Sequence, residues 1–130
     1  MIQEKLSVLP DTLPDYHPFP PAQERAAWEA LPQRVKDRFH QTAEAELAKP
    51  IAPLPLPLWL DFIRTGRRTP WEDAYFSRRS RLCALVCAEC VEHQGRYMDA
   101  IAETVWAICE ESAWQLPAHN SYIRDTPQLP

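Results

Sequence analysis

Apolar residues recur every three or four positions through most of the chain, and this spacing predicts helices with one apolar side. The clearest example is the segment 32–49, where the apolar positions stand four apart among charged residues: Val35, Phe39, Ala43 and Leu47. A shorter helix is expected over 21–31, with a proline at its start. No segment carries a convincing strand pattern. The sequence therefore predicts an all-α fold.

Two longer helices are expected in the second half of the chain, separated by a single glycine. The first begins with Thr69 as its N-cap and Glu72 three positions later, which is the arrangement of a capping box, and Gly95 ends it. Its apolar side is expected to carry Trp71, Tyr75, Leu82, Val86 and Cys90. The second helix runs from about Tyr97 to Ser112. Two such helices joined by a short turn form an antiparallel αα-hairpin.

Fourteen prolines and only two glycines indicate helices joined by rigid connections. Residues 1–20 contain four prolines and no periodicity, so they are expected to form an extended Pro-rich arm. The segment "PIAPLPLPL" (50–58) is expected to be an extended connection, because proline has no backbone N–H to donate. A ligand for a proline-recognition domain is the alternative. The overlapping "LWLDFIRTG" predicts a short helix that Gly66 ends.

The formal charge of −4 gives the chain no general attraction to nucleic acid or to anionic membranes. No apolar run is long enough to predict a membrane span. The start of the sequence lacks a basic stretch followed by an apolar one, so no export signal is expected. The four cysteines are then expected to be reduced thiols in the cytoplasm. No residue pattern points to a cofactor.

Three of the cysteines, Cys83, Cys87 and Cys90, have the spacing C-x3-C-x2-C, which resembles the cluster-binding motif of radical SAM enzymes. Here the spacing falls inside a predicted helix, where the three thiols would lie along one line and could not converge on one metal. We therefore expect these cysteines to be small core residues and expect no metal site.

Six arginines add positive charge to one region of the chain: Arg67, Arg68, Arg78, Arg79, Arg81 and Arg96. Two interpretations stay open. The arginines could lie on solvated helix faces and pair with neighbouring acids such as Glu72 and Glu92. Alternatively, they could form a local site for a carboxylate or a sulfate through bidentate contacts.

The most unusual stretch is "WAICEESAWQLPAHN", close to the end of the chain. Glu110 and Glu111 stand near the expected end of a helix, where the negative end of the helix dipole disfavours them. Trp114 follows where the chain leaves the helix, and His119 and Asn120 come after it. A tryptophan ring can stack on a sugar while acid, imidazole and amide groups bind its hydroxyls. The alternative is a tryptophan that covers the end of the hairpin beside solvated acids.

This stretch, together with "LPLWLDFIRTGRRTPWEDAYFSRRSRLCALV" and "PFPPAQERAAWEALP", resembles the N-terminal helical region of bacterial heparinase II/III-like polysaccharide lyases. The likeness extends from about Phe19 onward, and the run E-E-S-x-W-x-x-P-A-H is its most specific part. It implies that residues 21–130 are antiparallel helical hairpins of an incomplete α/α toroid. The rest of the toroid and a β-sandwich domain would lie outside this chain.

Members of that family cleave uronic-acid-containing polysaccharides by β-elimination. The resemblance therefore implies two partners, an acidic polysaccharide or oligosaccharide and the missing C-terminal part of the same protein. The resemblance implies that the residues of this run form part of a cleft wall: Glu110, Glu111, Ser112, Trp114, Pro117, Ala118 and His119. The residue pattern adds Asn120 to the expected substrate-binding residues. The family's catalytic groups belong to later elements, so no catalytic residue is assigned and this segment is expected to be inactive alone.

Two other functions stay open. A toroid glycoside hydrolase would use paired acids, with Glu110 or Glu111 as one of them. These two neighbours point about 100° apart on a helix and make a poor pair with each other. A non-catalytic helical module would instead bind a protein partner through its tryptophan-rich faces and the Pro-Leu stretch.

Overall fold

The computed structural model describes residues 17–119, and this part of the chain is helical and contains no strand. Its elements are α2 (Arg25–Glu29), α3 (Gln33–Leu47), α4 (Leu56–Thr65), α5 (Thr69–Glu92), α6 (Met98–Cys109) and a 3₁₀ helix, η1 (Pro117–His119). The prediction of an all-α fold is confirmed. Most of the expected arm at 1–20 lies outside the described residues. None of the described helices is long and apolar enough to cross a membrane.

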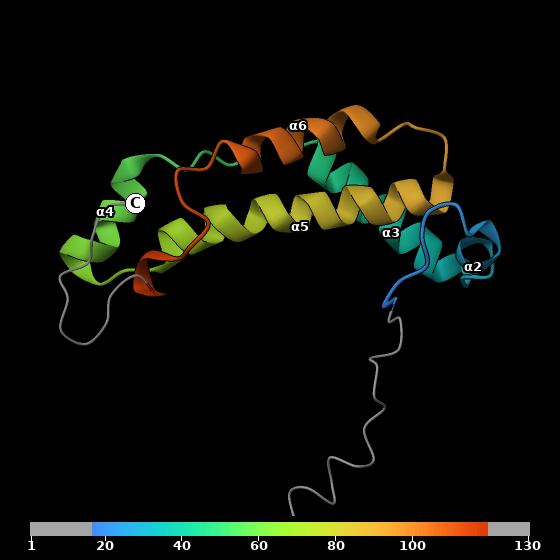
Figure 1. Cartoon of the computed structure of the whole chain (residues 1–130), viewed down its shortest axis with the longest axis horizontal. Helices are drawn as coiled ribbons and strands as arrows, with labels where there is room; N and C mark the ends of the chain where they lie inside the picture. Colours follow the sequence, from blue (N-terminus) through green and yellow to red (C-terminus); the bar gives the residue numbers. More distant parts are fainter. Residues whose placement is uncertain (1–16, 120–130) are drawn as a thin grey trace, which may run out of the picture.

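The long helix α5 forms the centre of the fold, and α6 runs back along it in the antiparallel direction, which confirms the expected αα-hairpin (Figure 1). Helix α3 also packs along α5, while α4 lies beside the beginning of α5 and α2 beside its end (Figure 1). The fully buried residues of the central core are Ala43, Leu85, Ala88 and Tyr97, and Ile101 packs against them. Trp59 of α4 meets Trp71 of α5 edge to face, with ring centroids 5.0 Å apart. This aromatic contact fixes α4 to α5.

The buried side of α5 differs from the side that its apolar spacing predicts. Leu85 and Ala88 are fully buried, whereas Val86 is 38% exposed. Arginines occupy two positions of the buried side, since Arg81 is 6% exposed and the side chain of Arg78 only 11%. Because these charged residues stand on the buried side of α5, the apolar spacing of the sequence does not reveal that side. The prediction that Val86 lies on the core side was therefore wrong.

Carbonyl groups at helix ends bind two arginines that are buried or half-buried. Arg81 donates hydrogen bonds to the carbonyl oxygens of Glu46 and Lys49, where α3 ends. Arg25 makes two such bonds to carbonyl oxygens at the end of α5, at 2.6 and 3.0 Å. The last carbonyls of a helix lack intrahelical donors and carry the negative end of its dipole, so a guanidinium group is well matched to them. These arginines tie the helix ends together.

The helix ends agree only in part with the sequence prediction. The capping box at Thr69 is not formed, because Thr69 is itself helical and no side chain caps the start of α5. Instead Glu72 pairs with Arg68, at 2.6 Å. At the other end, α5 stops at Glu92 because His93 adopts the left-handed conformation with φ of 54°, two residues before Gly95.

Helix α4 begins inside the proline-leucine segment, at Leu56. Pro57 lies in its first turn, where a helix needs no backbone N–H donor. The prediction of a non-helical connection therefore holds for 50–55 and was wrong for the residues after it. Gly66 ends α4 with φ of 75°, as expected.

The cysteines of the C-x3-C-x2-C spacing lie along α5, as expected. Cys83 is exposed, so the prediction that all three are core residues was wrong for it, while Cys87 and Cys90 are half-buried. Burial raises the pKa of the Cys87 and Cys90 thiols. Within residues 17–119, no group of three or more histidine, cysteine, aspartate or glutamate side chains could hold a metal ion.

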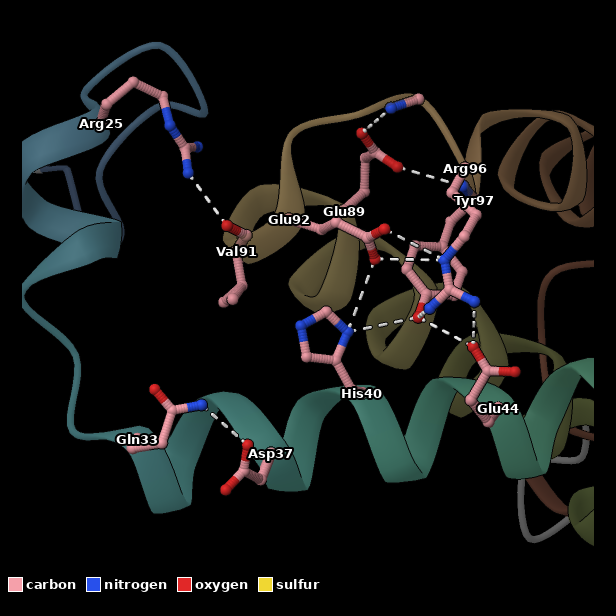
Figure 2. A network of polar contacts seen from close by, with 11 residues as sticks. Arg25, Gln33, Asp37, His40, Glu44, Glu89, Val91, Glu92, Arg96 and Tyr97 are labelled. Carbon is pink, nitrogen blue, oxygen red and sulfur yellow. Dashed lines mark hydrogen bonds and ion pairs between the residues drawn. The ribbon is translucent and has the colours of Figure 1, made fainter.

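The turn between α5 and α6 is closed by a polar network around Tyr97 (Figure 2). The carboxylate of Glu89 accepts hydrogen bonds from the backbone N–H groups of Gly95 and Tyr97, at 2.6 and 3.0 Å. The buried phenol of Tyr97 donates to Glu44 of α3, at 3.0 Å, and accepts from Arg96. The network therefore joins α3 to both helices of the hairpin.

Tyr97 gives the fold a specific dependence on alkaline pH. Burial and the hydrogen bond to Glu44 raise its pKa from 10.0 to about 12. A group with a raised pKa holds its proton more tightly in the folded state. Its contribution to the free energy of unfolding is therefore complete below pH 10 and is lost as the pH rises toward 12. We expect Tyr97→Phe to reduce the free energy of unfolding by about 1 kcal/mol at pH 8.

The difference between the wild type and Tyr97→Phe should then shrink as the pH rises from 10 to 12. Urea unfolding of both proteins across this pH range measures the difference in free energy of unfolding. Subtracting one protein's value from the other's removes the effect of the other tyrosines, which both proteins share. A difference that stays constant with pH would show that the Tyr97 phenol titrates alike in the folded and unfolded states.

Candidate functional site

The segment after α6 crosses the first half of α5 and reaches α4 (Figure 1). Helix α6 ends at Cys109, with Glu110 as its C-cap, and the chain then runs to η1, which contacts α4. Pro117 of η1 is fully buried and anchors the far end of the segment. The candidate residues therefore lie on a connection held at both ends, beside the beginning of α5.

Glu111 binds two arginines of α5. Its side chain is 1% exposed, and it accepts hydrogen bonds from Arg79 at 2.8 and 2.6 Å, one on each carboxylate oxygen. Arg78 donates a third, at 3.2 Å, and also binds the carbonyl oxygen of Ala107 near the end of α6. A buried bidentate ion pair of this kind fixes the position of the chain strongly. Glu111 therefore attaches the segment to α5.

The partners of Arg79 extend this ion pair to Tyr75. The guanidinium carbon of Arg79 lies 3.3 Å from the centroid of the Tyr75 ring. Burial alone would lower the pKa of Arg79, but the hydrogen bonds and charge of Glu111 raise it above its usual value. The guanidinium of Arg79 therefore stays charged at neutral pH.

Trp114 is exposed but held in place. The residue is 65% exposed. Its indole Nε1–H donates to the carbonyl oxygen of Ile108 at 3.0 Å, and its own carbonyl oxygen accepts from the Tyr75 hydroxyl at 2.8 Å. An exposed aromatic ring fixed by hydrogen bonds loses little conformational entropy when a ligand stacks on it.

A pocket of about 200 Å³ opens at the start of the segment, between α5 and the end of α6. Its polar lining comes from Arg78, Glu110, Glu111 and Ser112, and Trp71 forms part of its apolar wall. The indole N–H of Trp71 is buried and has no hydrogen-bond partner among the described residues. This N–H is enclosed by the protein, so the polar lining groups open to a small molecule are those of Arg78, Glu110 and Ser112. The pocket thus suits a small polar molecule.

The structure brings together only part of the predicted set. Glu110 is exposed and lines the pocket, while the carboxylate of Glu111 is already bound by arginines. Trp114 and His119 are exposed on the same segment but do not line this pocket. Asn120 lies outside the described residues.

Sequence reasoning missed the roles of Tyr75, Trp71 and the pair Arg78 and Arg79. A signal for Arg79 was present, because Arg79 and Glu111 each stand sixteen positions from Gly95. In an antiparallel hairpin that turns at this glycine, such positions lie side by side. Arg78 and Arg79 bind a carboxylate of the chain itself, Glu111, so the interpretation of a ligand site is not tested by this contact. The solvated-face interpretation is confirmed for Arg67 and Arg68, which are exposed and pair with nearby acids.

No protein-family model matches the chain, and no curated protein matches it.

Proposed function

We propose that the chain is the N-terminal helical part of a heparinase II/III-like polysaccharide lyase and helps to bind a uronic-acid-containing saccharide. The run that carries the resemblance is the connection that crosses α5, with Trp114 exposed upon it. The antiparallel pair of α5 and α6 is compatible with the hairpin unit of an α/α toroid. In this proposal the chain binds and shapes the substrate, and no described residue is assigned to proton transfer.

The observation that carries the proposal is the fixed, exposed ring of Trp114. A tryptophan with no ligand gains more by packing its ring against the protein, yet this ring is exposed. Its indole N–H is bound to Ile108 and its backbone carbonyl to Tyr75. The apolar face of a sugar ring can stack on the exposed ring. Glu110 and Ser112, in the neighbouring pocket, could bind sugar hydroxyls.

A calorimetric titration with a short oligouronate tests the proposal. We expect Trp114→Ala to weaken binding about tenfold, since one aromatic stacking contact contributes about 1 kcal/mol or somewhat more. Trp106→Ala is the matched control, because Trp106 is exposed to a similar degree, 69%, on α6. It should leave the dissociation constant unchanged. Equal losses in the two variants, or no binding by the wild type, would contradict the proposal.

The glycoside hydrolase alternative gains no support at this segment. A pair of catalytic carboxylates needs both acids to face the substrate. The Glu111 carboxylate is buried between arginines, so Glu110 alone remains exposed.

The alternative of a helical interaction module is favoured by a different observation, the outer side of α6. Its exposed apolar residues are Met98, Val105 and Trp106, which are between 41% and 69% exposed. An apolar helix face of this kind commonly packs against a further helix. That helix could belong to the rest of a toroid or to a separate protein, so this surface is compatible with the main proposal.

A further inference from the structure

A second pocket, of about 390 Å³, lies on α5 where α3 ends and the connection to α4 begins. The basic residues of its lining are Arg78, Arg81 and Lys49, and its one acid, Glu46, is paired with Lys49 at 2.7 Å. Ser77 and Ser80 of α5 add hydroxyl groups. The pocket therefore carries an excess of positive charge, although the chain as a whole is acidic.

Arg81 is buried without a carboxylate partner among residues 17–119. It is 6% exposed, and its Nε donates to the hydroxyl of Thr104 at 3.2 Å. Its Nη1 donates to the carbonyl oxygens of Glu46 and Lys49. These carbonyls carry only the partial charge of a helix end, which does not neutralise a full guanidinium charge. A buried charge without a counter-charge is costly, so this arginine favours an additional anion.

Both arginines of the pocket have nitrogens left for a ligand. Arg78 uses Nε for the carbonyl oxygen of Ala52 and Nη1 for Ala107 and Glu111. Arg81 uses Nε and Nη1, so Nη2 of each arginine has no acceptor among the described residues. The two residues are three positions apart on α5 and line the same pocket.

We propose that this pocket binds a small oxyanion through Arg78 and Arg81, with the Ser80 hydroxyl beside them. Guanidinium groups recognise sulfate, phosphate and carboxylate by the same charge-assisted hydrogen bonds. The bound group can be a free inorganic ion or the acidic substituent of a sugar. The proposal does not depend on saccharide binding at Trp114, which does not line this pocket.

Nitrogen-15 NMR of the arginine Nε–H signals tests the site. Sulfate, phosphate and glucuronate are titrated separately into the chain, with sodium chloride adjusted to hold the ionic strength constant. We expect saturable shifts of the Arg78 and Arg81 signals at about millimolar concentration with at least one of these anions. Saturation by the inorganic ions indicates a free oxyanion, and saturation by glucuronate alone indicates a sugar acid. Arg67, whose side chain is 68% exposed, is the internal control.

Two variants show whether the pocket itself binds the anion. Ser80→Asp places a carboxylate of the chain beside the arginines and should weaken anion binding at least about tenfold. Gln41→Glu adds the same charge on α3 outside the pocket and should leave binding unchanged. Trp114→Ala should also leave it unchanged, which separates this proposal from the one on saccharides. In the wild type, shifts that do not saturate, or that are as large at Arg67 as at the pocket arginines, would overturn the proposal. Unchanged anion binding by Ser80→Asp would overturn it as well.

Discussion

Replacing Glu111 by alanine is expected to lower the free energy of unfolding by about 3 kcal/mol. The substitution leaves Arg79 and Arg78 without the buried carboxylate that they bind, and it releases the segment after α6 from α5. Arg79 is partly exposed and can turn toward water, which places the expected loss at the lower end of the range for buried pairs. Urea unfolding followed by circular dichroism measures the loss.

The matched control is the preceding residue. Glu110 carries the same side chain one position earlier and is exposed, so Glu110→Ala should change the free energy of unfolding by no more than about 0.5 kcal/mol. If the two substitutions have equal effects, Glu111 does not hold the segment in place, and the fixed position of Trp114 loses its explanation.

Replacing Leu85 by alanine is expected to cost about 3 kcal/mol, because Leu85 is fully buried in the core between α3, α5 and α6. Val86→Ala removes methyl groups from the next residue, which is 38% exposed, and should cost less than about 1 kcal/mol. The apolar spacing of the sequence predicts the reverse order. Thermal and urea unfolding of the two variants therefore decide which side of α5 faces the core, and a larger loss for Val86→Ala would contradict the described packing.

Much of the fold could be predicted from the sequence, because its helices follow local rules. The apolar spacing of α3, the glycine that ends α4 and the short turn between α5 and α6 each depend on a few neighbouring residues. Helix ends were less predictable. Thr69 has a suitable residue type for a cap, yet the helix already includes it. Local propensity does not decide such a choice when tertiary contacts compete with it.

The buried side of α5 could not be predicted from apolar spacing, because Arg78 and Arg81 occupy part of it. These arginines are stabilised by carbonyl groups from distant segments, at Ala52, Ala107 and the end of α3. Such partners become visible only when the helices are placed side by side. For the same reason, the dipole argument treated Glu111 as misplaced at a helix end, while its arginine partners compensate for the unfavourable dipole.

The candidate site shows the same division between local and tertiary information. Sequence reasoning identified Trp114 and Glu110 as unusual residues, and both are exposed on the connection after α6. It could not show that Tyr75 and the carbonyl of Ile108 hold Trp114, since these contacts depend on the path of the chain over α5. The function of the exposed ring stays a proposal.

The most direct test of that proposal is a nuclear Overhauser measurement on the chain with a bound oligouronate. If the saccharide stacks on the fixed ring, its carbon-bound protons should give intermolecular signals to the ring protons of Trp114 and none to those of Trp106, although the two residues are similarly exposed. Signals to Trp106 alone, or to both rings equally, would contradict the account, because they would mean that any exposed tryptophan binds the sugar as well as the one the segment holds in place.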